Sequence, residues 1–88
     1  MGFWVRTLLV TVPPSELEEA LAGHLEHLRR LKSDGRLRAA GELGDGDGFL
    51  EIFEAADRRE AEAVARSSPL VEDGLATWML REWEELSL

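Results

Sequence analysis

The chain has 88 residues and a net charge of −8, from 10 basic and 18 acidic side chains. This length leaves room for one compact domain, which we assign to residues 1–88. A negative surface repels phosphate groups, so neither nucleic acid nor an anionic membrane is an expected partner. Cysteine is absent, which excludes disulfides and thiolate metal sites and is compatible with a cytoplasmic location.

Residues 3–12 are predicted to form the first strand, because both of their alternating faces are apolar except at Arg6. Pro13 and Pro14 end the strand, and the segment lacks the basic start and cleavage site of a signal peptide. A strand that is apolar on both sides must be covered on both sides. Helices of the same chain can cover only one of them.

A first helix is predicted from Ser15 to Gly35. Ser15 and Glu18 have the spacing of a capping box. An apolar stripe follows at helical spacing, formed by Leu17, Leu21, His24, Leu28 and Leu31. Gly35 is expected to end the helix in the left-handed conformation.

Two strands are predicted over residues 36–43 and 49–54, joined by a glycine-rich hairpin at 44–48. The hairpin is preferred to a calcium loop because position 49 is Phe where such a loop needs an oxygen ligand. It is preferred to a phosphate loop because a strand follows it rather than a helix.

Asp57 and Glu60 form a second capping box, which begins a short helix that Ser67-Ser68-Pro69 ends. Residues 75–83 are predicted as the last strand. The order βαββαβ predicts a ferredoxin-like α+β sandwich, in which two helices cover one face of a four-stranded antiparallel sheet. The other face would expose large apolar side chains, which predicts a homodimer formed through the sheet.

His24 is the main candidate for chemistry, because it lies inside the apolar stripe and faces the sheet. Histidine is the usual acid–base residue near neutral pH, but a buried histidine with a hydrogen-bond partner can also be purely structural. His27 falls at the edge of the stripe and is expected to face water. Two histidines without a third ligand do not predict a metal site, and no cofactor is indicated.

From His24 onward the chain resembles the YciI-like (YCII-related) family. The matching segments are His24-Leu25, Asp34-Gly35-Arg36-Leu37, Ala40-Gly41, Gly48-Phe49, Ser68-Pro69-Leu70 and Asp73-Gly74-Leu75. The resemblance implies the ferredoxin-like fold, a dimer with its sheets face to face (a dimeric α/β barrel), and a small-molecule pocket near the histidine with acid–base or lyase-type chemistry. The muconolactone isomerases share the order of elements but lack a histidine at this helix position, and we rank them second.

The chain departs from the family pattern at three positions. Ser68 stands where the family has an Asp that would orient the histidine, Glu42 stands where it has a Pro, and Leu21 where an Arg is common. His24 is therefore expected to have lost its carboxylate partner. Ser68 can still bond an imidazole, and Glu42 is a candidate substitute from the second strand.

These observations leave two hypotheses. In the first, the chain is a homodimer that binds a small organic molecule, with His24 as the acid–base (lyase-, hydrolase- or isomerase-type) residue and with Ser68 and Glu42 as ligand-binding or orienting residues. In the second, the loss of the family Asp has left a catalytically degenerate ligand-binding or accessory interaction module.

Overall fold

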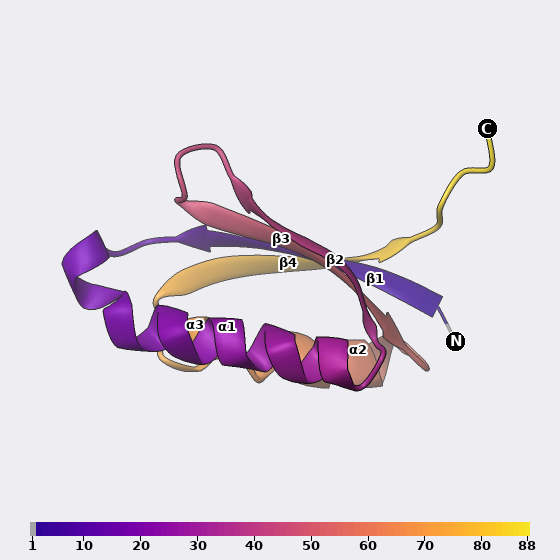
Figure 1. The fold of residues 1–88 in the computed structure, drawn as a ribbon, viewed down its shortest axis with the longest axis horizontal. Coiled ribbons are helices and arrows are strands. Elements are labelled where there is room, and N and C mark those ends of the chain that lie inside the picture. The colour runs from indigo at the N-terminus through magenta and orange to yellow at the C-terminus, as the bar shows by residue number, and fades with distance from the viewer. Residues whose placement is uncertain (1) are drawn as a thin grey trace.

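A four-stranded antiparallel sheet organises residues 2–88, the part of the chain that the computed structural model describes. Met1, which our domain assignment includes, lies outside these residues. The strands are β1 (Gly2–Val10), β2 (Leu37–Leu43), β3 (Gly48–Ala55) and β4 (Ala76–Trp83), in the spatial order β2-β3-β1-β4. The helices α1 (Glu18–Ser33), α2 (Arg58–Arg66) and α3 (Pro69–Glu72) lie on one face of the sheet (Figure 1). The predicted ferredoxin-like α+β fold is confirmed.

The central strand β1 pairs with β3 on one side and with β4 on the other. Its side chains alternate strictly, so that Trp4, Arg6 and Leu8 are buried beneath the helices while their neighbours face the other side. The register places Arg6 directly opposite Glu51 of β3. Two charged side chains therefore meet on the helix-covered face of the sheet.

The β2–β3 hairpin forms as predicted. Gly44 and Gly46 adopt φ values of 50° and 85°, the left-handed region that favours glycine. A side chain at Gly48 would place its Cβ 2.5 Å from the backbone oxygen of Leu8, so only glycine permits this close approach of the hairpin to β1.

The start of α1 differs from the prediction. Pro14–Glu16 forms a 3-10 turn, labelled η1, and α1 begins at Glu18 after an N-cap residue, Leu17, that makes no side-chain capping bond. Pro14 fixes its own φ and starts a tight turn early, which places Ser15 inside that turn rather than before the helix. The predicted capping box at Ser15 is therefore wrong. Gly35 follows the end of α1 with φ 73°, as expected.

The second capping box is half confirmed, and a helix that was not predicted follows α2. The Asp57 side chain accepts a bond from the Glu60 N–H, but the Glu60 carboxylate pairs with Arg36 instead of returning to Asp57. Ser68 and Pro69 end α2 as expected and then start α3, because the Ser68 hydroxyl caps its first turn and proline suits that position.

Two apolar clusters fill the space between sheet and helices. One contains Trp4, Phe53, Ala61, Ala65 and Leu80; the other contains Leu8, Ala20, Phe49 and Leu70. Trp78 packs against both. Burial of one such large side chain stabilises the fold by roughly 1.5–3 kcal/mol. Arg6 and Glu51 occupy the strand positions between the two clusters.

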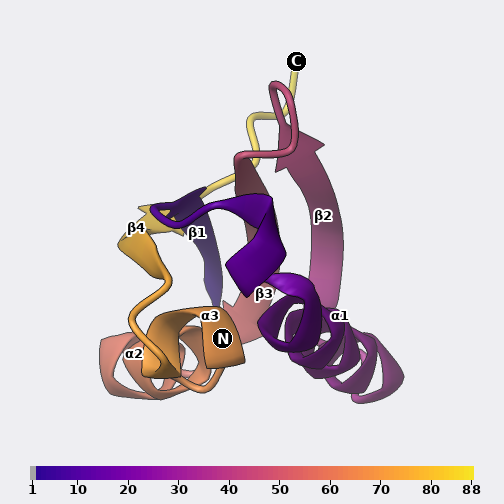
Figure 2. The same ribbon diagram turned by 90° about the vertical axis from the view of Figure 1, so that its left-hand side faces the viewer.

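The face of the sheet opposite the helices, which we call the open face, has no element covering it within residues 2–88 (Figures 1 and 2). Phe3, Leu50 and Met79 lie on the open face, whereas Trp4, Phe49 and Trp78 lie on the covered one. Leu9 and Met79 are 54% and 59% exposed there.

No helix within residues 2–88 combines the length and apolar character needed to cross a membrane.

Candidate functional site

His24 points from the middle of α1 into the space between the helices and the sheet, and it is fully buried. Its Nδ1 lies 2.6 Å from the Ser68 hydroxyl oxygen, and its Nε2 lies 2.9 Å from Oε2 of Glu51. The ring packs against Phe49 with centroids 5.2 Å apart. Both ring nitrogens are thus held by side chains from other elements, which fixes the orientation of the imidazole.

The partners of the ring also determine where its proton lies. Burial alone would raise the pKa of Glu51, but the hydrogen bond from His24 and the charge of Arg6 outweigh burial and lower it. An ionised carboxylate only accepts, so Nε2 of His24 carries a proton and donates it to Glu51. In the neutral ring, Nδ1 then accepts the hydroxyl proton of Ser68, whose oxygen in turn accepts the Leu70 N–H at 3.2 Å.

Arg6 completes the network on the sheet side. Its Nε donates to Oε1 of Glu51 at 2.7 Å, and its Nη1 donates to the Ala65 carbonyl at 3.0 Å. Both charged side chains are fully buried, so each depends on the other for neutralisation. The Nη2 atom of Arg6 is also buried, and no acceptor lies within reach among the described residues.

His27 belongs to the same network, which corrects its predicted position in water. It is half-buried one turn after His24, and its Nε2 lies 3.3 Å from Nη1 of Arg6. Since the guanidinium can only donate, this nitrogen accepts and the ring is neutral. Burial first, and then the charge of Arg6, lowers the pKa of His27 from 6.5 to about 4.

Of the predicted site residues, the structure brings His24 and Ser68 together but not Glu42. Glu42 is exposed near the hairpin end of β2, opposite Phe49, and both nitrogens of His24 are occupied by other partners. The expectation that His24 has lost its carboxylate was wrong, because Glu51 supplies one from β3. A direct contact between Glu42 and a ligand stays a prediction.

Sequence reasoning missed Glu51 and Arg6, although both carry a signal. Arg6 interrupts a strand that is otherwise apolar, and Glu51 lies between Phe49 and Phe53 on the buried face of β3. A charge on a face that is otherwise apolar needs a partner on that same face. The pairing of β1 with β3, which the sequence did not reveal, supplies it.

A tight contact between α1 and α3 lies beside the network. Gly23 and Pro69 approach so closely that a Cβ at position 23 would lie 2.8 Å from Cγ of the proline. These residues directly precede His24 and follow Ser68. A ligand can reach the ring of His24 only if side chains or helices around it move.

Within the described part of the chain, no group of three or more His, Asp or Glu residues is arranged to hold a metal ion.

The model of one protein family, the YCII-related domain, matches residues 6–84. The uncharacterised protein YjpA of Bacillus subtilis is 34% identical over 67 residues, which cover 76% of this chain and 79% of that protein.

Solved structures with the same fold include two enzymes. The 5-chloro-2-hydroxyhydroquinone dehydrochlorinase of Burkholderia phenoliruptrix, solved with 2,5-dihydroxybenzoquinone, aligns with a TM-score of 0.72 at 22% identity, covering 92% of this chain and 93% of that one. Muconolactone isomerase aligns with a TM-score of 0.78 at 14% identity, covering 96% and 90%. At these identities the likeness concerns the fold alone. The family match and the Bacillus relative show more: the chain belongs to the YCII-related family.

Proposed function

We propose that this chain binds a small organic molecule with an anionic oxygen beside His24, and that His24 exchanges a proton with it. The observation that carries the proposal is the buried series of hydrogen bonds from Ser68 through His24 and Glu51 to Arg6. A histidine held in one orientation, with a carboxylate on one nitrogen and a lone pair on the other, is the arrangement that general base catalysis requires.

In this mechanism Nδ1 of His24 is the basic atom. A proton leaves the bound molecule for Nδ1, either directly or through the hydroxyl of Ser68, and the imidazolium formed keeps its Nε2 proton bonded to Glu51. The negative charge of Glu51 stabilises that cation, as the family Asp would have done. Arg6 keeps Glu51 ionised, so it acts on the reaction through the carboxylate.

The unpartnered Nη2 of Arg6 supports the choice of ligand. A buried guanidinium nitrogen without an acceptor destabilises the protein, and an oxygen atom of a carboxylate or phenolate would satisfy it. The two similar enzymes support a small organic substrate by analogy of fold, since one was solved with a hydroxylated quinone and the other is named for a lactone.

The homodimer is part of the same proposal. The open face presents Phe3, Leu50 and Met79 on three adjacent strands, and a continuous apolar surface of this kind is uncommon on a monomer. A second copy that packs its own open face against it would shield both surfaces by a two-fold interface.

A second function is favoured by a different observation. The ring of His24 is fully enclosed, and both of its nitrogens already have protein partners. In this second function the network serves only to join α1, α3 and the sheet. The chain is then a catalytically inactive ligand-binding or accessory module.

The ring signals of His24 in NMR spectra separate these functions, with a His27→Ala variant to assign them. Benzoate is the probe, because it combines a carboxylate with a small ring. The acid–base proposal expects a saturable shift of the His24 signals, with a Kd below about 1 mM. Glu51→Gln should abolish the shift, and Glu42→Gln should leave it unchanged.

The inactive module predicts a different result. The His24 Nε2 proton would keep the same frequency and the same slow exchange with solvent at every benzoate concentration. That outcome would remove His24 from the list of ligand-binding groups.

A further inference from the structure

The guanidinium group of Arg6 ends between α1 and α2, where its donors are only partly used. Its Nη1 donates to the Ala65 carbonyl of α2 at 3.0 Å and lies 3.3 Å from Nε2 of His27 on α1. Its Nη2 is buried and has no acceptor among residues 2–88. A guanidinium group binds most strongly to a carboxylate that accepts from two of its nitrogens at once. At Arg6, one of two such nitrogens is free and His27 occupies the other.

His27 is a weak occupant of this position. The separation of 3.3 Å between its Nε2 and Nη1 of Arg6 is longer than the roughly 2.7–2.9 Å of a bond from a guanidinium to a charged oxygen. A neutral imidazole offers a lone pair without a charge. A carboxylate is therefore the stronger acceptor for the same donor and can compete with the ring.

His27 is also the part of the network that solvent reaches. Arg6, His24, Glu51 and Ser68 are fully buried, whereas His27 is half-buried. Rotation of this one side chain would uncover Nη1 of Arg6 without a shift of any helix. His27 thus covers the charged group that a ligand would need, and it can be moved aside.

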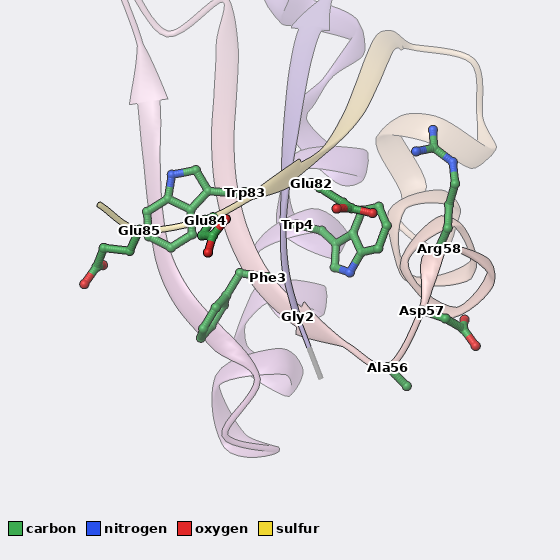
Figure 3. A pocket seen from close by; sticks show the side chains of 10 residues that line it. All are labelled: Gly2, Phe3, Trp4, Ala56, Asp57, Arg58, Glu82, Trp83, Glu84 and Glu85. Carbon is green, nitrogen blue, oxygen red and sulfur yellow. The ribbon is translucent and has the colours of Figure 1, made fainter. Parts of the chain in front are cut away.

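Two clefts in the described part of the chain do not provide another route to Arg6. One, of about 870 Å³, lies where β1 begins and β4 ends, and none of its lining residues belongs to the network (Figure 3). The other lies between α1 and α3, and its walls include the carboxylates of Glu16, Glu19 and Asp73, which repel an anion. Entry past His27 avoids both.

We propose that His27 is a displaceable occupant of the ligand site. A carboxylate of the ligand replaces its ring on Nη1 of Arg6 and accepts from Nη2 with the second oxygen. The ring turns outward to admit the ligand and returns when the ligand leaves. This inference rests on the proposed function and deepens it, because it specifies a carboxylate rather than a phenolate and makes His27 a competitor of the ligand.

The affinity for benzoate, measured by calorimetry, tests the competition. His27→Ala removes the competing acceptor and should bind benzoate roughly five- to twentyfold more tightly than the wild type, which corresponds to one hydrogen bond to a charged group. His27→Gln restores an acceptor oxygen and should stay within about threefold of the wild type. Leu25→Ala, at an exposed position on the same helix, is the matched control and should leave the affinity unchanged.

A pair of probes tests the requirement for two oxygens. The anions para-cyanobenzoate and para-cyanophenolate carry the same substituted ring and are both charged in alkaline buffer. Only the carboxylate can accept from Nη1 and Nη2 of Arg6 together, so it should bind at least about fivefold more tightly. Equal affinities would contradict the choice of a carboxylate.

The pH dependence of binding is a readout that a purely structural histidine would not change. In the free protein, burial first and then the charge of Arg6 lower the pKa of His27 from 6.5 to about 4. A ring displaced into solvent regains its ordinary pKa and takes up a proton below it. Benzoate should therefore bind roughly five- to tenfold more tightly at about pH 5.5 than at about pH 7.

The His27→Gln variant should lack this part of the pH dependence. The other charged or titratable groups around His27 are Arg6, Arg30, Glu51 and His24. Both arginines keep their charge in this range, and the lowered pKa of Glu51 keeps it ionised. A proton bound by His24 would also be bound in His27→Gln, so the difference between the two profiles belongs to His27.

Three results would overturn the proposal. They are a benzoate affinity of His27→Ala no higher than that of the wild type, equally tight binding by His27→Ala and His27→Gln, and identical pH profiles for the wild type and His27→Gln.

The ring signals of His24 distinguish this failure from a failure of the acid–base function. If benzoate shifts them in the wild type but His27→Ala gains no affinity, the acid–base function stands and the role of His27 is refuted. If His27→Ala gains affinity while the His24 signals stay unchanged, benzoate binds at Arg6 and the proton exchange with His24 is refuted.

Discussion

Each face of the sheet carries some side chains of the kind that its surroundings disfavour. Beneath the helices, the covered face buries a charged pair and His24 among its apolar clusters, while the open face exposes Met79 and Leu9 to solvent. A small domain gains most of its stability by burying apolar area, so neither choice is explained by the stability of one isolated chain.

The disfavoured side chains on the two faces correspond to two different parts of the proposed function. The covered face holds polar groups that apolar residues could replace at little cost in stability, as the proposed acid–base function would require. The open face holds apolar groups that polar residues could replace, as the proposed dimer would require. Four variants test this contrast.

Glu51→Gln should have the largest effect. It leaves the buried Arg6 without a counter-charge, and loss of one member of a buried pair lowers the free energy of unfolding by about 3–5 kcal/mol. Glu54→Gln, on the same strand but the open face, should change it by less than about 0.5 kcal/mol. Urea denaturation at one fixed protein concentration measures both, and equal losses would contradict the assigned faces. Replacing Arg6 and Glu51 together by Met should recover most of the loss.

Met79→Lys should weaken the proposed dimer by at least about 100-fold, or about 2.7 kcal/mol, because each copy would bury an unpaired ammonium group in the interface. Leu25→Lys adds the same charge on α1, on the other side of the molecule, and should leave association unchanged. Sedimentation equilibrium measures the dissociation constant of the dimer for the wild type and both variants. A wild-type protein that is monomeric at micromolar concentrations would rule out the dimer.

Ser68→Ala should lower the free energy of unfolding by about 1–2 kcal/mol, because it removes the cap of α3 and leaves Nδ1 of His24 without its donor. Ser67→Ala is the neighbouring control, since that hydroxyl is exposed and its hydrogen bond within residues 2–88 is to the Val64 carbonyl. A loss within 0.5 kcal/mol of the control would mean that Ser68 does not hold the imidazole.

The last prediction concerns pH. Between pH 6.5 and about 4 the unfolded chain binds a proton on His27 that the folded chain does not, so the free energy of unfolding should fall as the pH is lowered through this range. The lowered pKa of Glu51 adds a further fall only below its ordinary value of 4.5. His27→Gln should flatten the first part of the profile and leave the second. An unchanged slope above pH 4.5 would contradict the assignment to His27.

Sequence patterns predicted the fold well because its signals are local. Alternation in the strands, the glycines of the hairpin and the spacing of the leucines in α1 each concern residues close in the chain. The start of α1 was misplaced because Pro14 favours a 3-10 turn over the capping geometry of Ser15, a competition that residue spacing alone does not resolve.

The candidate site was predicted only in part, because it depends on contacts between distant residues. His24 was identified as a candidate from its position in the apolar stripe of α1, and Ser68 from the family resemblance. Glu51 and Arg6 are 45 residues apart in sequence and meet only through the register of β1 with β3. The search for a carboxylate therefore turned to Glu42, which lies on the neighbouring edge strand and not beside His24.

The contact between Gly23 and Pro69 sets the length of the neighbouring hydrogen bond between His24 and Ser68. Because the helices meet there without space for a methyl group, the spacing of α1 and α3 is set by two residues that have no functional group of their own. Any enlargement at position 23 would lengthen the 2.6 Å link between His24 and Ser68, even with both of those residues unchanged. In protein engineering, a residue introduced at position 68 should therefore carry a donor or acceptor that reaches Nδ1 of His24 across this fixed distance. Position 23 should be left as glycine.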